Sequence, residues 1–279
     1  MRILGVIGKA VLGLGIGGLS VLAGIRALDD RHVDSLWRFL AEAEGTREPF
    51  REEMVAGLPA PARRYFLHAI RPGTPLASKL IWAYHGEIRP NTAMPWLSLT
   101  AEQIVVKERG FVWKARASKG PLVLTAADHY LDGEGRMRIA LFGLVPVVNA
   151  TGPDLSRSAL ARLLVESIAL PAALLPGPRV EIEGIDERRF AAKLSLQGER
   201  TPLTLTVDET GRLKEFVMQR WGDLTDDRSF RYIPYGGFVD EERSFDGYTI
   251  PSRLRIGWWF GTDRYQEAIR LRLDWAVLS

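Results

Sequence analysis

The sequence predicts a mainly β protein. We expect one large, curved antiparallel sheet, a half-barrel with a covering helix, preceded by N-terminal helices that include a transmembrane segment. Three observations predict this fold. From residue 80 onward, apolar side chains recur with a period of two in many successive segments, which is typical of strands. Residues 156–170 instead show helical spacing, and residues 3–25 contain a single charged side chain.

The N-terminal segment, residues 1–30, is predicted to be a membrane anchor or signal segment. A helix over residues 3–25 would reach about 34 Å at about 1.5 Å per residue, which is enough to cross a bilayer. The uninterrupted apolar run 10–25 is shorter and also suits a cleavable signal peptide. Basic residues precede this run, so we expect a single-pass protein whose C-terminal domain lies outside the cytoplasm, or export after cleavage.

The glycines of the apolar segment have two interpretations. Gly13, Gly15 and Gly18 match the dinucleotide pattern G-x-G-x-x-G. A nucleotide fold would need a second strand where residues 34–44 predict a helix, so the pattern is out of context. The spacing of Gly13 and Gly17 is also that of membrane helices that pack closely, which makes self-association through these glycines a candidate interaction.

Composition excludes several kinds of site. The chain has no cysteine and a formal net charge of +3. Disulfides and thiolate metal sites are therefore excluded, and a nucleic-acid partner is not expected. The four isolated histidines, His32, His68, His85 and His129, give no metal motif. We expect neither a metal nor a cofactor, and no serine-hydrolase motif is present.

The remaining chain divides into two expected regions. Residues 31–75 are predicted to be a helical linker region, with an amphipathic helix near 33–44 and a proline-started helix within 58–70. Residues 76–279 are predicted to form the sheet domain. The predicted strands are 80–89, 102–107, 111–118, 122–131, 136–144, 180–185, 190–197, 202–207, 213–221, 236–244, 249–257 and 265–275. Asp246-Gly247 is a strong hairpin signal between two of them.

The inserted helix at 156–170 is bounded by Gly152-Pro153-Asp154 and by Pro171. A curved sheet needs something to cover its concave face, and this helix is the predicted cover. Its apolar stripe would face the sheet and consists of Leu160, Leu163, Leu164 and Ile168.

A ligand cavity is predicted between this stripe and aromatic residues of the sheet. The expected cavity residues of the sheet are Trp82, Trp113, Phe142, Trp221, Trp258 and Trp259. Adjacent Trp258 and Trp259 would place bulky rings on opposite faces of a strand. Arg162 and Glu166 lie one helical turn apart, so they form either a surface ion pair or a polar latch or headgroup contact at the cavity. No catalytic residue is predicted.

Several short stretches carry a family resemblance. They are LPAPARRYF (58–66), LTAEQ (99–103), GFVWKAR (110–116), LFGLVPVVNATGPD (141–154), ARLLVES (161–167), LPAALLPG (170–177) and FDGYTIPSR (245–253). In this order and spacing they resemble an uncharacterised bacterial family of membrane-anchored proteins, a domain of unknown function. That family is similar in architecture to LolA/LolB-like lipoprotein carriers and mycobacterial lipid-binding lipoproteins, whose half-open antiparallel barrels hold acyl chains under helical lids.

The resemblance implies a membrane-anchored domain that binds a lipid or other hydrophobic molecule between sheet and helix. The chain lacks the cysteine that such lipoproteins use for lipid attachment, so a soluble shuttle is not implied. Two other functions stay open, a non-enzymatic envelope scaffold or interaction module and an enzyme with an unrecognised site. A large apolar cavity would favour ligand binding, a filled interior would favour a scaffold, and convergent buried polar groups would favour an enzyme.

Overall fold

The computed structural model describes residues 16–46 and 48–279. The helical elements are α2 (Ile16–Ala41), η1 (Glu52–Val55), α3 (Ala60–Ala69), α4 (Pro153–Val165), η2 (Glu166–Ala169) and η3 (Pro171–Leu174). Half of the predicted anchor segment, residues 1–15 with Gly13, lies outside the described residues, and the surroundings of Gly17 are not described either. No helix within the described residues is long and apolar enough to cross a membrane.

Thirteen strands form one antiparallel sheet, which confirms the mainly β prediction. They are β1 (Lys79–Ile88), β2 (Leu97–Val106), β3 (Gly110–Lys119), β4 (Leu122–Leu131), β5 (Glu134–Leu141), β6 (Val145–Thr151), β7 (Val180–Gly184), β8 (Arg189–Leu196), β9 (Glu199–Val207), β10 (Leu213–Gly222), β11 (Arg231–Phe245), β12 (Tyr248–Trp258) and β13 (Gln266–Leu278). The order β6-β5-β4-β3-β2-β1-β13-β12-β11-β10-β9-β8-β7 describes two meanders joined where β1 pairs with β13.

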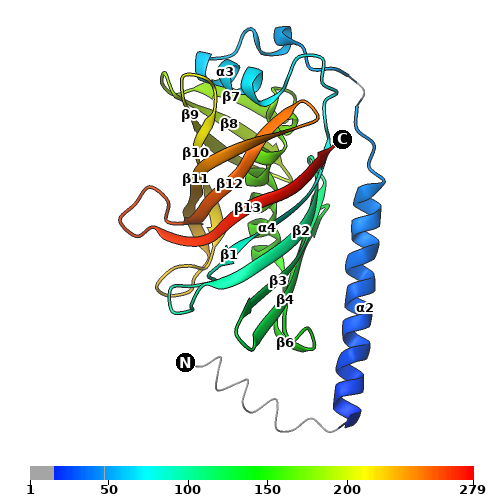
Figure 1. Cartoon of the computed structure of the whole chain (residues 1–279). Helices are drawn as coiled ribbons and strands as arrows, with labels where there is room; N and C mark the ends of the chain where they lie inside the picture. Colours follow the sequence, from blue (N-terminus) through cyan, green and yellow to red (C-terminus); the bar gives the residue numbers. More distant parts are fainter. Residues whose placement is uncertain (1–15, 47) are drawn as a thin grey trace.

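This order places β6 and β7, which are consecutive in sequence, at opposite edges of the sheet. The connection between them contains α4, η2 and η3 and crosses the concave side of the curved sheet (Figure 1). Helix α4 contacts β5 in one meander and β10 in the other. The predicted single helix 156–170 therefore begins earlier, at Pro153, and continues from Glu166 as 3-10 turns, because a helix commonly tightens near its end and Pro171 cannot continue it.

Local sequence signals explain several connections. Asp246 (φ 47°) and Gly247 (φ 98°) form the two-residue turn between β11 and β12, which confirms the predicted hairpin. The proline-started helix is confirmed as α3. The periodicity predicts no strand at β6, since Pro146 interrupts it, yet a proline is tolerated there because β6 is an edge strand.

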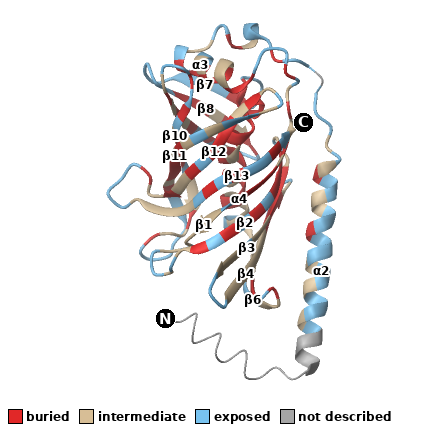
Figure 2. Ribbon diagram, in the orientation of Figure 1, coloured by how far each residue is buried: buried red, intermediate tan, exposed pale blue. Residues whose placement is uncertain are grey.

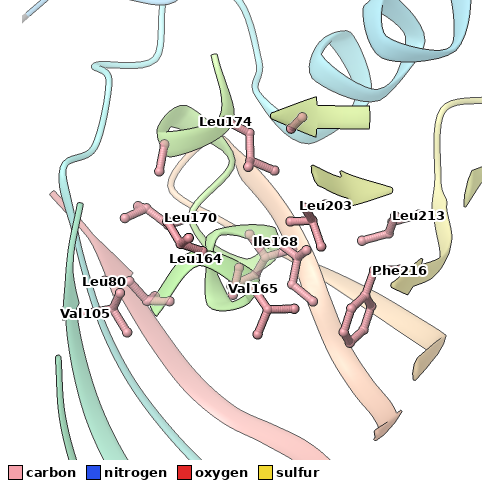
Figure 3. Close-up of a cluster of buried hydrophobic side chains, with 14 of the residues drawn as sticks. Leu80, Val105, Leu164, Val165, Ile168, Leu170, Leu174, Leu203, Leu213 and Phe216 are labelled. Atoms are coloured by element: carbon pink, nitrogen blue, oxygen red, sulfur yellow. The ribbon is translucent and has the colours of Figure 1, made fainter. Parts of the chain in front are cut away.

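The main hydrophobic core lies between the concave face of the sheet and the α4–η3 segment. Figure 3 shows side chains of this segment, Leu164, Val165, Ile168, Leu170 and Leu174, between Leu80 and Val105 on one side and Leu203, Leu213 and Phe216 on the other. The same segment thus buries apolar surface of both meanders. Figure 2 shows the buried residues concentrated along this interior.

Helix α2 packs on the outer face of the sheet and forms a second, smaller core. This core contains Val33, Leu40, Ile104, Val106 and Val112. The helix crosses the predicted boundary at residue 30 and ends at Ala41. Lys79 caps this end of the helix, because its Nζ donates to the carbonyl oxygen of Ala41 (2.7 Å) and to that of Ala43 just beyond it (3.0 Å). A cation at a helix C-terminus is the stabilising arrangement.

The contact between His32 of α2 and His129 of β4 should make the stability of the fold depend on pH. The rings of His32 and His129 stand edge to face with centroids 5.5 Å apart. Burial, aided by the nearby His32 and Arg136, lowers the pKa of His129 from 6.5 to about 4. The folded protein therefore binds this proton less well than the unfolded chain does. The resulting stabilisation is present above about pH 6.5 and is lost as the pH falls to about 4.

We expect the free energy of unfolding to fall over this range by up to about 3 kcal/mol more in the wild type than in His129→Gln. Urea unfolding of both proteins across the range measures the difference. Identical pH dependence in the two proteins would show that His129 titrates as it does in the unfolded chain.

Candidate functional site

Charged and polar side chains meet inside the main core, beside α4. Arg162 of α4 donates from Nη1 to Asp128 Oδ2 of β4 (2.6 Å) and from Nε to Glu166 Oε1 (2.7 Å). Its side chain is 15% exposed. The guanidinium also lies over the rings of Phe111 and Trp113, at 4.8 and 4.9 Å from their centroids. The Asp128 and Glu166 carboxylates and the two aromatic rings of β3 thus hold this cation against the sheet.

Hydrogen bonds extend this arrangement across three strands. Gln103 Nε2 of β2 donates to Glu166 Oε2 (2.6 Å), and Trp82 Nε1 of β1 donates to Gln103 Oε1 (3.2 Å). Trp113 Nε1 donates to the Tyr84 hydroxyl (2.7 Å). We refer to Gln103, Asp128, Arg162 and Glu166 as the polar cluster. It ties the end of α4 to the concave faces of β1–β4.

Burial determines the electrostatics of the polar cluster. It raises the pKa of the Asp128 and Glu166 carboxyl groups above their ordinary values, against the opposing effect of Arg162. The two carboxylates in turn raise the pKa of Arg162 in spite of its burial. Asp128 Oδ1 is buried without a hydrogen-bond partner among the described residues. The cluster is held together by its mutual pairing, because each charge alone would be costly in this environment.

A second cation, Arg220 of β10, lies next to the polar cluster. Its Nε donates to the carbonyl oxygen of Ser158 in α4 (3.3 Å), and its guanidinium lies 4.7 Å from the Tyr235 ring centroid and 5.0 Å from that of Trp258. Within the part of the chain that the structure describes, it makes no ion pair with a carboxylate. Burial lowers the pKa of Arg220 below its ordinary value. Arg220 is thus a cation held between aromatic rings.

The structure gathers most of the predicted site residues. Trp82 and Trp113 contact the polar cluster that contains Arg162 and Glu166. The apolar stripe residues are buried around it in the main core, namely Leu160, Leu163, Leu164 and Ile168. Trp258 joins through Arg220. Trp221 lies near the start of α4, where its Nε1 donates to Asp154 Oδ1 (2.8 Å).

Phe142 and Trp259 lie elsewhere. Phe142 is 56% exposed in the turn between β5 and β6. Strand β12 ends at Trp258, so Trp259 does not alternate with it across a strand. Trp259 instead has φ 60° in the β12–β13 connection, and its Nε1 donates to the carbonyl oxygen of Leu224 (2.9 Å).

Sequence reasoning missed the strand members of the polar cluster and its neighbours, which are Tyr84, Gln103, Asp128, Arg220 and Tyr235. A signal was present for some of them. Asp128 lies between Ala126 and Tyr130 in the alternation of its strand, so a carboxylate occupies a position on the apolar face. A polar side chain on the buried face of a strand needs a hydrogen-bond partner, and the helix that covers this face is where such a partner is expected.

Side chains fill the space between α4 and the sheet. Near Leu163 and Leu164 the cavity measures about 20 Å³, which is enough for about one water molecule. A groove of about 600 Å³ lies instead between α2 and the sheet, with charges of both signs, including Arg26, Asp30 and Arg116, along its walls. No group of metal-binding side chains occurs among the described residues.

Comparisons with known proteins identify a family. The family of unknown function DUF6544 matches residues 48–269, which confirms the resemblance to an uncharacterised family. No curated protein matches the chain. A structure described as an outer membrane lipoprotein-sorting protein domain, from Vibrio parahaemolyticus, is similar at 7% identity and a TM-score of 0.38, covering 72% of this chain and 86% of that one.

A LolA superfamily protein from Nitrosomonas europaea is similar at 9% identity and a TM-score of 0.35, covering 78% of this chain and 92% of that one. Scores and identities this low give no residue correspondences, so no site residue is transferred from either structure.

Removing the cation of the polar cluster should destabilise the fold. Arg162→Met leaves Asp128 and Glu166 buried without their partner, and loss of one member of a buried pair costs about 3–5 kcal/mol. Urea unfolding measures this cost. As a matched control, Arg188→Met removes an exposed arginine that is 3.9 Å from Glu209, and it should change stability little. Equal effects of the two substitutions would show that water solvates the polar cluster.

Proposed function

Because the chain belongs to the DUF6544 family of unknown function, we propose its function from the site: the domain binds a lipid or other hydrophobic molecule between the curved sheet and α4. The observation that carries this proposal is the cover itself. A single helical segment hides the apolar concave face of both meanders, and the polypeptide chain connects it to the sheet only through the two edge strands. Moving it breaks no strand pairing.

Helix α4 is bounded by residues that interrupt a regular helix. Gly152 (φ 111°) precedes α4, and Pro171 follows η2 and begins η3. Since the interior is filled, a ligand must displace α4 to reach the apolar face. Displacement would give up buried apolar contacts of the helix, and the acyl chain of a ligand would replace them with contacts of the same kind.

The polar cluster and Arg220 indicate which headgroup the ligand would carry. Displacing α4 would separate Arg162 from Asp128, which costs energy unless the ligand supplies a new partner, and an anionic headgroup could pair with the Arg162 guanidinium. Arg220 offers a guanidinium without a carboxylate partner among the described residues, between the rings of Tyr235 and Trp258. An amphiphile with an acidic headgroup matches both features.

Two observations favour the alternatives. The filled interior is what a non-enzymatic envelope scaffold or interaction module requires. The convergence of Asp128, Glu166 and Arg162 with shifted pKa values is what an enzyme would show. A scaffold needs no movement of α4, whereas ligand binding does. An experiment that fixes α4 to the sheet therefore distinguishes the two functions.

A reversible clamp on α4 provides the test. A Cβ atom added at Gly135 of β5 would lie 3.1 Å from the Ala159 Cβ atom of α4. Disulfides join Cβ atoms about 3.5–4.5 Å apart, so a Gly135→Cys/Ala159→Cys pair needs only a small outward shift of the helix. The natural chain has no other thiol to interfere. We expect the delipidated protein to take up lipid when this disulfide is reduced and none when it is oxidised, as measured by native mass spectrometry.

The two single-cysteine variants control for the substitutions and for the oxidant, and both should take up lipid under either condition. Equal uptake by the oxidised and reduced double variant would place the ligand elsewhere. Absence of uptake by the wild type would leave the scaffold as the better account.

We also propose that this domain works outside the cytoplasm, anchored by its N-terminal segment. The support is the sequence of residues 3–25, whose only charged side chain is Lys9. A reporter enzyme that is active only outside the cytoplasm, fused after Ser279, should be active, and a reporter that requires the cytoplasm should not. The reverse pattern would contradict the proposed topology.

A further inference from the structure

Phe142 combines an unfavourable backbone conformation, which is held by a hydrogen bond from its N–H group to the Val123 carbonyl oxygen (2.8 Å), with an exposed side chain. It occupies the turn between β5 and β6 with φ 52°, in the left-handed region that is unfavourable for a bulky residue. Its side chain is also 56% exposed. Asparagine or glycine would suit such a turn better. Residues kept in unfavourable conformations commonly serve a function, and here the function would concern the exposed ring.

Trp259 provides a comparison within the same chain. It is the other bulky aromatic residue with a left-handed backbone (φ 60°). Its indole nitrogen donates to the Leu224 carbonyl oxygen, and the Arg264 guanidinium lies 4.2 Å from the ring centroid. The Trp259 ring therefore makes contacts within the fold, whereas the Phe142 ring is exposed.

The turn is attached to α2 beside Phe142. Arg26 Nη1 donates to the Gly143 carbonyl oxygen (2.6 Å). Figure 1 shows that α2 begins at the same end of the molecule as the turn that leads into β6. This hydrogen bond places Phe142 next to Arg26 along the axis of α2.

This level coincides with a change of polarity along α2. Val21, Ile25 and Leu28 are exposed and lie on one helical face at i, i+4 and i+7. Charged residues follow from Asp29 onward, whereas residues 3–25 contain Lys9 as their one charge. An arginine at such a boundary keeps its guanidinium in the polar interface while its stem lies along apolar surface.

We propose that the β5–β6 turn is a membrane-contact element, and that the Phe142 ring inserts into the interface of the phospholipid bilayer that the residues preceding Arg26 enter. The inference rests on the membrane location proposed above and is independent of the ligand between α4 and the sheet. Helix α2 continues without a break from Ile16 into the domain, so it would hold this turn at the bilayer surface. A phenyl ring prefers such a position to water.

A substitution at the turn separates a membrane role from a structural one. Phe142→Asn replaces the ring by a residue that favours the left-handed conformation. We expect the melting temperature of the detergent-solubilised full chain to stay unchanged or rise. A marked fall in melting temperature would mean that the ring stabilises the fold, and would overturn the proposal.

Site-specific probes test the contact directly, because the chain contains no cysteine to compete for labelling. Val21→Cys, Phe142→Cys and Ile185→Cys would each carry an environment-sensitive fluorophore. The full-length variants would be reconstituted in vesicles of phosphatidylcholine and phosphatidylglycerol containing a nitroxide-labelled lipid. Ile185 is the matched control, because it is 47% exposed in the β7–β8 turn.

We expect blue-shifted emission and strong nitroxide quenching at positions 21 and 142, and water-like emission at position 185. Quenching at 21 with water-like emission at 142 would overturn this inference and leave the membrane location standing. Water-like emission at both would overturn both proposals. Quenching at 185 as strong as at 142 would also overturn the inference, since the contact would not be specific to this turn.

Discussion

The architecture depends on one topological constraint: strands that are consecutive in sequence, β6 and β7, occupy opposite edges of the sheet. The chain between them crosses from one edge to the other on the concave side, so the cover of the sheet and this crossing connection are the same segment. Its apolar residues bury both meanders at once, as Leu164 and Ile168 do in Figure 3. A sheet with so many strands would otherwise leave its inner face in water.

The sequence predicted this architecture because alternation and turn chemistry are local. Asp246-Gly247 specifies its hairpin, and the apolar stripe of residues 160–168 specifies a buried helical face. Strand order is not local, so the pairing of β1 with β13 was not predicted. The same limit applies to the site. Arg162 and Glu166 are one turn apart and could be found, whereas Asp128 reaches them only through the curvature of the sheet.

The buried charges give the interior a different character from that of an ordinary apolar core. An interior held only by apolar contacts would tolerate sliding of the helix, whereas the polar cluster requires Arg162 to meet Asp128 and Glu166 at hydrogen-bond distance. The closed position of α4 is therefore specific in geometry. Opening the cover separates Arg162 from Asp128, which costs energy unless a ligand pairs with the charges that the separation exposes. This combination suits a cover that returns to one position.

The two helices that flank the sheet depend on the same strand register. Trp113 faces Arg162 on the inner side, and its pairing partner is Asp128. The neighbouring pair, Val112 and His129, faces α2 on the outer side. A slip of one residue between β3 and β4 would move every side chain of the slipped strand to the other face. Such a slip would remove the polar cluster and the α2 contact together. The packing of α2 on the outer face therefore stabilises the register on which the inner site depends.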